Sequence, residues 1–264
     1  MTEQTEVLVK KYSENGITTL TLNQPERRNS LSMAMLEALS AELESVSGDK
    51  DTRVVVIAAA GQVFCAGHDL REIRGQLDSH EFQLKLFNQC SKVMQQIVNL
   101  PKPVIARVAG VATAAGCQLV ASCDLAVAAD TARFATPGVN IGLFCSTPMV
   151  ALSRNVSRKQ AMEMLMTGEF IDAPTAERYG LVNRVVAAGE LDAAIRELAA
   201  TVAAQGPAFV AAGKKLFYRQ IEDGLTGAYK EATKTMVENM QREDARQGIN
   251  AFLEKRDMPE WKDR

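Results

Sequence analysis

The chain has 264 residues, which is enough for one large domain or for one domain with a helical appendage. Hydrophobic residues make up 47% and can fill a sizeable core, whereas the net charge of -2 gives no general attraction for nucleic acid or for a membrane surface. No apolar run is long enough to span a bilayer, the start does not resemble a signal peptide, and two histidines are too few for a multi-histidine metal site.

The cysteines point to a reducing environment. They are Cys65, Cys90, Cys117, Cys123 and Cys145, an odd number without the paired spacing of a metal site. We read them as free thiols of a cytoplasmic protein, or of a mitochondrial matrix protein if the chain is a processed eukaryotic one.

The first elements expected are two β-rich runs, Val7–Val9 and Ile17–Leu22. Asn15-Gly16 between them predicts a hairpin turn.

Helical spacing of apolar residues from Leu31 to Val46 then predicts a helix, which Asn29 or Ser30 could cap. The continuous apolar run 53–59 is typical of a strand buried on both faces. A long helix fits 81–99, and two prolines end that segment.

The rest of the chain changes from strands to helices. Two more buried strands are expected at Val104–Val111 and Asp124–Ala129, with a short helix near 116–122 between them. Later helices are expected around Met162, Leu165 and Met166 with a stop at Gly168, over Ala173–Tyr179 with a stop at Gly180, and, two or three in number, within 190–253. This order predicts an α/β core with a helical C-terminal region.

The segment Val63–Leu70 directly follows a buried strand, where ligand sites of α/β folds lie. Ala66-Gly67 allows a sharp turn that frees the following N–H groups to point at a ligand. A plain turn explains the same pair, and for Ala-Gly alone it is the favoured interpretation.

The segment Val108–Gln118 also follows a buried strand and runs into a helix. Its small residues allow close approach to the backbone, and the first turn of the helix offers unpaired N–H donors. Two such loops could grip one oxygen as an oxyanion hole. Tight packing of helix on strand needs small residues as well, so the spacing alone leaves both interpretations open.

The segment Ala135–Pro148 is a loop rich in glycine and proline that carries polar atoms, among them Asn140, Cys145, Ser146 and Thr147. It could form one wall of an active site. From composition alone, a connecting loop is favoured.

These three segments, in this order and at these separations, resemble the crotonase (enoyl-CoA hydratase/isomerase) superfamily, and the likeness extends over nearly the whole chain. Leu22–Leu31 resembles the family's first CoA-contacting loop, and Gly248–Lys255 resembles the end that packs near CoA. Among subgroups, Phe64–Leu70 and Thr136–Pro148 look most like the enoyl-CoA hydratase domain-containing protein 3 type.

The resemblance implies an α/β fold with a crotonase-like ββα spiral core over residues 1–200 and a C-terminal helical trimerisation region over residues 201–264. It implies a homotrimer or a dimer of trimers that takes acyl-CoA thioesters as substrates. Coenzyme A is then part of the substrate, and no separate cofactor, metal, membrane or nucleic-acid partner is expected.

The resemblance also assigns site residues. The backbone N–H groups of His68 and Ala115 fall on the two oxyanion donors. The positions that fall on contacts to substrate or CoA are Arg28, Ala66, His68, Asp69, Leu70 and, near CoA and often from a neighbouring subunit, Phe252 and Lys255.

Two departures from the family concern acid–base chemistry. Gln118 and Gly138 stand where typical hydratases carry the two glutamates that activate water and supply the proton. An amide can orient water but has no titratable proton near neutral pH, and glycine has no side chain. Ala114 and Ala115 stand where the family usually has glycine; alanine keeps its N–H, but its methyl group narrows the approach.

Other groups could replace the glutamates. Asp69 is ionisable, although a structural use is favoured. Cys145 or Ser146 falls near the place where some isomerase-type relatives carry an acidic group, but an inert buried cysteine is the commoner case. His68 is the better candidate by its ordinary pKa, although its role in the family is through the backbone.

The leading hypothesis is an enzyme that stabilises a thioester enolate or oxyanion and catalyses isomerisation, decarboxylation or thioester hydrolysis rather than efficient water addition. The alternative is an acyl-CoA-binding protein without turnover. Nucleic-acid binding is a third possibility, which the even charge balance disfavours. Arg27-Arg28 and Lys214-Lys215 are more simply read as phosphate contacts to CoA or as solvated surface.

Overall fold

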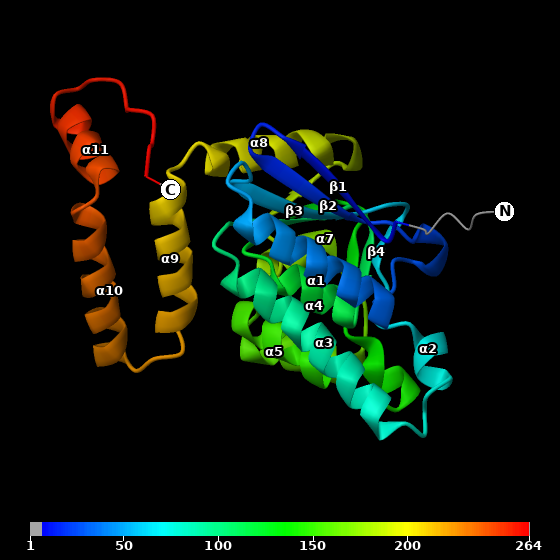
Figure 1. The fold of residues 1–264 in the computed structure, drawn as a ribbon. Coiled ribbons are helices and arrows are strands. Elements are labelled where there is room, and N and C mark those ends of the chain that lie inside the picture. Colours follow the sequence, from blue (N-terminus) through cyan, green and yellow to red (C-terminus); the bar gives the residue numbers. More distant parts are fainter. Residues whose placement is uncertain (1–6, 264) are drawn as a thin grey trace.

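The computed structural model describes residues 7–263. Residues 1–6 of the expected core and residue 264 of the expected C-terminal region therefore lie outside the described part. Within it, helices cover both faces of a larger sheet, a smaller sheet lies beside it, and a C-terminal arm stands apart from the core (Figure 1). The helices are α1 Met33–Gly48, α2 Leu70–Arg74, α3 His80–Asn99, α4 Ala115–Ser122, α5 Ser146–Asn155, α6 Arg158–Thr167, α7 Ala173–Tyr179, α8 Leu191–Ala203, α9 Pro207–Gln220, α10 Leu225–Met240 and α11 Glu243–Leu253, with short 3-10 turns η1 Pro25–Arg27, η2 Pro137–Ile141 and η3 Ala188–Glu190.

The larger sheet has the strand order β1-β2-β3-β5-β7-β10 among the described residues. Its strands are β1 Val9–Glu14, β2 Ile17–Leu22, β3 Val54–Ala59, β5 Val104–Val108, β7 Leu125–Ala129 and β10 Arg184–Val186. Neighbouring strands are parallel except for the antiparallel hairpin β1–β2.

The hairpin confirms the predicted turn, because Asn15 and Gly16 have φ angles of 51° and 78°. The first strand nevertheless runs over Val9–Glu14 rather than over Val7–Val9, with Val9 paired to Leu22. This is an edge strand whose residues after Val9 are exposed, so it lacks the hydrophobic alternation that would have revealed its length.

Strand β3 is buried on both faces, as its apolar run predicts. Val55 and Ile57 belong to the hydrophobic cluster that includes α1 and α3, whereas Val54 and Val56 pack in a second cluster with α8. The larger sheet is therefore the middle layer between α8 on one side and α1 with α3 on the other (Figure 1).

The smaller sheet has the order β4-β6-β8-β9, with β4 Val63–Cys65, β6 Val111–Thr113, β8 Arg133–Ala135 and β9 Ile171–Asp172. The pairs β3–β4, β5–β6 and β7–β8 each place one strand in the larger sheet and the next in the smaller one, and a helical segment follows each pair. These repeated units confirm the expected ββα spiral.

The strand expected over Val104–Val111 is wrong in its extent, because the structure divides it into β5 and β6 in different sheets. Gly110 marks the division. A Cβ atom at this glycine would overlap the carbonyl oxygen of Gln62, so the chain turns here in close contact with the preceding unit.

The N-cap of helix α1 lies three residues after Asn29 and two after Ser30, the two predicted caps. Ser32 is the N-cap, since its hydroxyl accepts a hydrogen bond from the N–H of Met35 at 3.2 Å. Asn29 is instead in the left-handed region with φ of 50°.

Helix α6 confirms the segment around Leu165, but Met162 and Met166 point to solvent, being 44% and 64% exposed.

The C-terminal part has four helices from α8 to α11 in the described chain, where two or three were expected. Only α8 packs on the larger sheet, and α9 to α11 form the arm (Figure 1). No described helix combines the length and the apolar character that crossing a bilayer requires.

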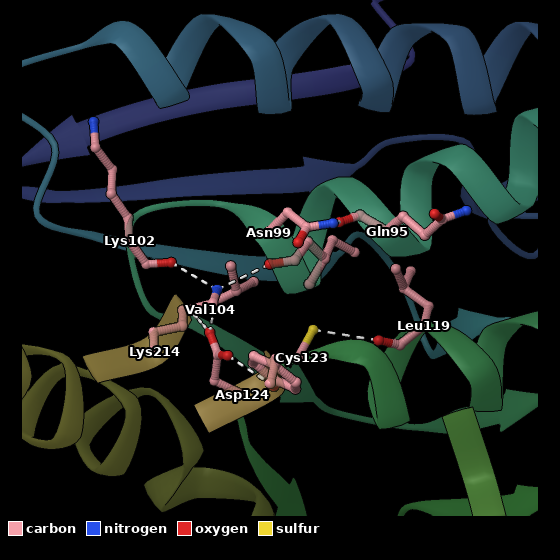
Figure 2. A network of polar contacts seen from close by, with 10 residues as sticks. Gln95, Asn99, Lys102, Val104, Leu119, Cys123, Asp124 and Lys214 are labelled. Carbon is pink, nitrogen blue, oxygen red and sulfur yellow. Dashed lines mark hydrogen bonds and ion pairs between the residues drawn. The ribbon is translucent and has the colours of Figure 1, made fainter. Parts of the chain in front are cut away.

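A buried polar network attaches the arm to the core (Figure 2). The ammonium of Lys214 on α9 donates hydrogen bonds to the carbonyl oxygens of Ile97 and Lys102, both at 2.9 Å, and to the carboxylate of Asp124 at 2.7 Å. The hydroxyl of Tyr218, one helical turn further along α9, donates to the other oxygen of Asp124 at 2.8 Å.

Burial lowers the pKa of Lys214 and raises the pKa of Asp124, and the attraction between the two charges opposes both shifts. Burial also raises the pKa of Tyr218, which stays a neutral donor. Because Val104 N–H donates to Asp124 as well, all three ammonium hydrogens of Lys214 and both carboxylate oxygens of Asp124 have partners.

Candidate active site

The candidate site begins where the parallel strands of the smaller sheet end. Strands β4, β6 and β8 run side by side, so the residues that follow them meet at one edge. The N–H of Ala114 donates to the carbonyl of Ala135 at 2.9 Å, which links the segments after β6 and β8.

The first loop contains Gly67 with φ of 89°, a conformation that favours glycine. A Cβ atom built on Gly67 would lie 3.0 Å from the Ala114 methyl carbon and 3.3 Å from the backbone nitrogen of Ala115. The structure thus brings together the two loops that the sequence singled out.

The second loop carries a strained residue. Ala114 has φ of 49° and ψ of -117°, outside the regions that side chains ordinarily allow. Helix α4 starts at the next residue, and a Cβ atom on Gly116 would overlap the carbonyl oxygen of Cys65. Helix α4 therefore packs closely on the first loop and also begins with an N–H group that has no acceptor in the helix. The sequence presented close packing and a free N–H donor as alternatives.

The backbone N–H groups of His68 and Ala115 are available to a ligand. Within residues 7–263, neither N–H donates a hydrogen bond to another group. Ala115 is the first residue of α4, where the helix itself provides no acceptor and the helix dipole is positive.

The side chain of His68 is largely buried. Its Nδ1 lies 3.1 Å from the carbonyl oxygen of Leu31, and its Nε2 has no hydrogen-bond partner. The ring of Phe87 from α3 meets it edge to face, with 5.1 Å between ring centroids. Burial lowers the pKa of His68, and the Leu31 carbonyl offsets part of this shift.

Gln118 lies one turn into α4 and is buried. Its Oε1 is 4.0 Å from the sulfur of Cys90, a weak contact. Burial raises the pKa of Cys90 to about 12, so this residue remains a thiol. The two side chains form a pair without a charged group.

Gly138 lies in the third segment, under the sulfur of Cys145. Its N–H donates to that sulfur at 3.3 Å. Burial raises the pKa of Cys145, and the N–H of Gly138 offsets part of the shift. Ser146 starts α5, is exposed, and donates its hydroxyl to the carbonyl of Phe144 at 3.2 Å.

The expected CoA contacts fall into two groups in space. Ala66 and Asp69 flank the first loop, Leu70 begins α2 and is 53% exposed, and Arg28 is exposed and bonded through its carbonyl to the N–H of Ala66 at 3.1 Å. The carboxylate of Asp69 caps α2 and meets Arg27 at 3.4 Å, so it serves the loop's structure.

Phe252 and Lys255 are not part of this arrangement within one chain. Phe252 is on α11 and 72% exposed, and Lys255 follows the same helix in the arm. Figure 1 shows α11 at the far end of the molecule from α2.

A wide cleft lies away from these two loops. It measures ≈ 1880 Å³ and runs between α9 and the core, with Gln118, Ser122 and Tyr218 among its lining residues. Neither His68 nor Ala115 lines it. We place the site at the two loops because the free N–H groups and the close backbone approach are there.

Sequence reasoning missed two residues. The buried side chain of Asn29 accepts from the N–H of Gln24 at 2.9 Å and donates to the carbonyls of Ala60 and Val63 at 2.8 Å, which fixes the Leu22–Leu31 loop. Asparagine's tolerance of the left-handed region could have indicated it. Thr136 is buried with an unpartnered hydroxyl, and its type and position gave no signal.

Comparisons with known proteins point to one family. The family model described as Enoyl-CoA hydratase/isomerase matches residues 12–264. The mitochondrial enoyl-CoA hydratase domain-containing protein 3 of Rattus norvegicus is 46% identical over 96% of this chain and 84% of its own length. The Homo sapiens protein of the same name is 47% identical over 94% of this chain and 81% of its own length.

Solved structures give the same result. The crystal structure of an enoyl-CoA hydratase from Mycobacterium smegmatis is 54% identical, with a TM-score of 0.94 over 96% of this chain and 98% of that one. The human enoyl Coenzyme A hydratase domain-containing protein 3 is 45% identical, with a TM-score of 0.92 over 96% and 99% of the two chains.

Proposed function

Because the chain belongs to the enoyl-CoA hydratase/isomerase family, we propose that it binds acyl-CoA thioesters and polarises their carbonyl with the backbone N–H groups of His68 and Ala115. The observation that carries this proposal is the contact between the two loops: the Cβ position of Gly67, next to His68, is 3.3 Å from the nitrogen of Ala115. Both N–H groups lack an acceptor among residues 7–263.

Two such donors favour the transition state over the substrate. Negative charge develops on the carbonyl oxygen when a thioester becomes an enolate or a tetrahedral intermediate, and fixed donors meet it without reorganisation. Removing one donor of this kind typically raises the barrier by about 2.7–4 kcal/mol. Isomerisation, decarboxylation and thioester hydrolysis all use this stabilisation.

Efficient hydration is not the reaction that these side chains support. Water addition needs a base and an acid at fixed places, and the amide of Gln118 and the bare backbone of Gly138 provide neither. The lack of a base and an acid at residues 118 and 138 also favours the second candidate, an acyl-CoA-binding protein without turnover.

We further propose that the CoA portion is held by the loop around Arg28 and the first turn of α2, together with Phe252 and Lys255 from a neighbouring subunit. The arm supports assembly into a trimer or a dimer of trimers, because it exposes large apolar side chains. They include Leu225, Tyr229, Met236, Phe252 and Leu253. Light scattering that gave a monomer at micromolar concentration would contradict the assembly.

Five free cysteines, all buried, support a reducing compartment, the cytoplasm or the mitochondrial matrix. The Rattus norvegicus and Homo sapiens relatives named above are described as mitochondrial.

Calorimetric titration with butyryl-CoA and with free CoA tests the binding proposal. We expect the thioester to bind more tightly than CoA, and absence of binding by either would refute the acyl-CoA assignment. Crotonyl-CoA hydration, compared with a hydratase that has both glutamates, tests the reaction. We expect turnover lower by a factor of at least about 100, the lower end of a general acid–base contribution. Equal turnover would show that other groups replace the glutamates in hydration.

A further inference from the structure

The candidate site lacks an evident base. Asp69 is occupied as the cap of α2 and as the partner of Arg27. The thiol of Cys145 is buried and accepts a hydrogen bond from Gly138. Gln118 is an amide, and its neighbour Cys90 stays protonated.

The imidazole of His68 differs from these groups because one of its nitrogens is unoccupied. A carbonyl oxygen can only accept a hydrogen bond, so the contact of Nδ1 with Leu31 assigns the ring proton to Nδ1. The neutral ring then carries its lone pair on Nε2. Burial favours this neutral form, which is the form that can accept a proton.

The unpartnered Nε2 is unusual in a folded protein. Buried polar atoms nearly always have a partner, and the exceptions call for an explanation such as a role toward a ligand. Leu31 and Gly67 fix the position of the ring: the N–H of Leu31 donates to the carbonyl of Gly67 at 2.8 Å, and the carbonyl of Leu31 holds Nδ1. In catalytic sites a general base is oriented in the same way, by a group that holds its other nitrogen.

The ring is also attached to the chain close to the place where the thioester carbonyl would bind. His68 provides one of the two proposed oxyanion donors through its own backbone N–H, so its side chain starts at the point where the thioester carbonyl would bind. The α-carbon of an acyl group is bonded directly to that carbonyl. Phe87, which meets the ring edge to face, is 37% exposed.

We propose that the imidazole of His68 is the base of this site and that it removes the α-proton of a bound acyl-CoA. The inference rests on the proposed function, since it needs the thioester at the two loops. The C–H bond at the α-carbon breaks and its proton moves to Nε2. The electron pair forms the enolate, whose oxygen the N–H groups of His68 and Ala115 hold. Return of this proton from the imidazolium to the γ-carbon completes an isomerisation. Return of a proton to the α-carbon, after the imidazolium has exchanged its own proton with solvent water, completes a hydrogen exchange.

Deuterium exchange into vinylacetyl-CoA tests this proposal. Its α-protons lie between a thioester and a double bond, and mass spectrometry measures deuterium uptake in D2O separately from binding. The variants are His68→Gln, which keeps the backbone donor but is not basic, and His68→Phe, which keeps an aromatic ring against Phe87. The other histidine of the chain, His80, is exposed at the start of α3, so His80→Gln is a matched control.

We expect both His68 variants to lose exchange by about 100-fold or more, the range of a general base, while His80→Gln keeps the wild-type rate. Thioester affinity and the thermal midpoint should stay close to wild type in at least one His68 variant. Added imidazole should restore part of the exchange in His68→Ala, which a purely structural role would not produce.

Exchange at the wild-type rate in His68→Gln would overturn the assignment. A wild-type protein that binds the thioester without exchanging its α-protons would also overturn it, while leaving the proposed binding function in place. A wild-type protein that binds no thioester would instead refute the proposed function.

Discussion

The sulfur of Cys145 lies where a side chain at residue 138 would have to begin. A Cβ atom built on Gly138 would be 2.9 Å from this sulfur and 2.9 Å from the carbonyl oxygen of Leu143. A side chain at residue 138 would therefore fit only if this loop moved. The surrounding loop has closed over the position.

Replacing Gly138 should destabilise the protein without restoring hydration. Gly138→Ala must displace either a backbone carbonyl or a buried thiol, and overpacking of this kind costs about 1–3 kcal/mol. Gly138→Glu should lose more and should gain no crotonyl-CoA hydration. Urea denaturation measures the cost, with Gly189→Ala as the control because nothing lies within 4 Å of a Cβ there. Equal stability of the Gly138 and Gly189 variants would contradict the packing argument.

Replacing Ala114 by glycine should stabilise the chain. Backbone strain of the kind seen at Ala114 costs about 1–3 kcal/mol, whereas the added freedom of glycine in the unfolded chain costs about 0.5–1 kcal/mol. We therefore expect the free energy of unfolding of Ala114→Gly to rise by about 1 kcal/mol. The neighbouring strand residue in Ala112→Gly has no such strain and should lose stability instead. A loss in both variants would show that the Ala114 conformation is not strained.

The stability of the protein should fall in mildly acidic solution, in part because of His68. Its folded pKa lies below the value of about 6.5 of a free imidazole, so below that pH the unfolded chain binds a proton that the folded chain does not. The contribution of the neutral ring is complete above about pH 6.5 and is lost as the pH falls toward the folded pKa. Urea denaturation at several pH values should give a shallower pH dependence for His68→Gln than for wild type or His80→Gln. Parallel curves for all three proteins would rule this linkage out.

Removing the charge of Lys214 should strongly destabilise the protein. Lys214→Met keeps the apolar stem but leaves the buried carboxylate of Asp124 without its counter-ion, a change that costs about 3–5 kcal/mol. Combining it with Asp124→Asn removes the uncompensated charge, so the double variant should lose less than the sum of the two single changes. Thermal and urea unfolding of the four proteins gives the comparison. A loss below about 1 kcal/mol in Lys214→Met would mean that the ion pair is a surface-type contact.

Much of the fold followed from local patterns. The run of apolar residues in β3 indicated burial on both faces, and Asn15-Gly16 indicated the hairpin, because each pattern has one simple structural cause. Strand β1 and the start of α1 were misplaced for a different reason. An exposed edge strand has no apolar alternation, and the choice between Asn29 and Ser32 as the cap depends on carbonyls about 31 residues away that hold the Asn29 side chain.

The candidate site could be predicted only in part from the sequence. The two loops could be identified, since small residues after a buried strand have a limited set of uses. The strain at Ala114, the occupied space above Gly138 and the unpartnered nitrogen of His68 all depend on how segments distant in the chain pack together. No spacing rule gives such three-dimensional relationships.

The ion pair between Asp124 and Lys214 also constrains the order in which parts of the chain can fold during synthesis. Its partners are separated by 90 positions, so during synthesis the carboxylate emerges long before its ammonium partner. A chain released before α9 would leave the carboxylate of Asp124 without its counter-ion. We therefore expect the last helices to dock after the spiral has formed, and products shortened before α9 to be recognised by the cell as unfinished.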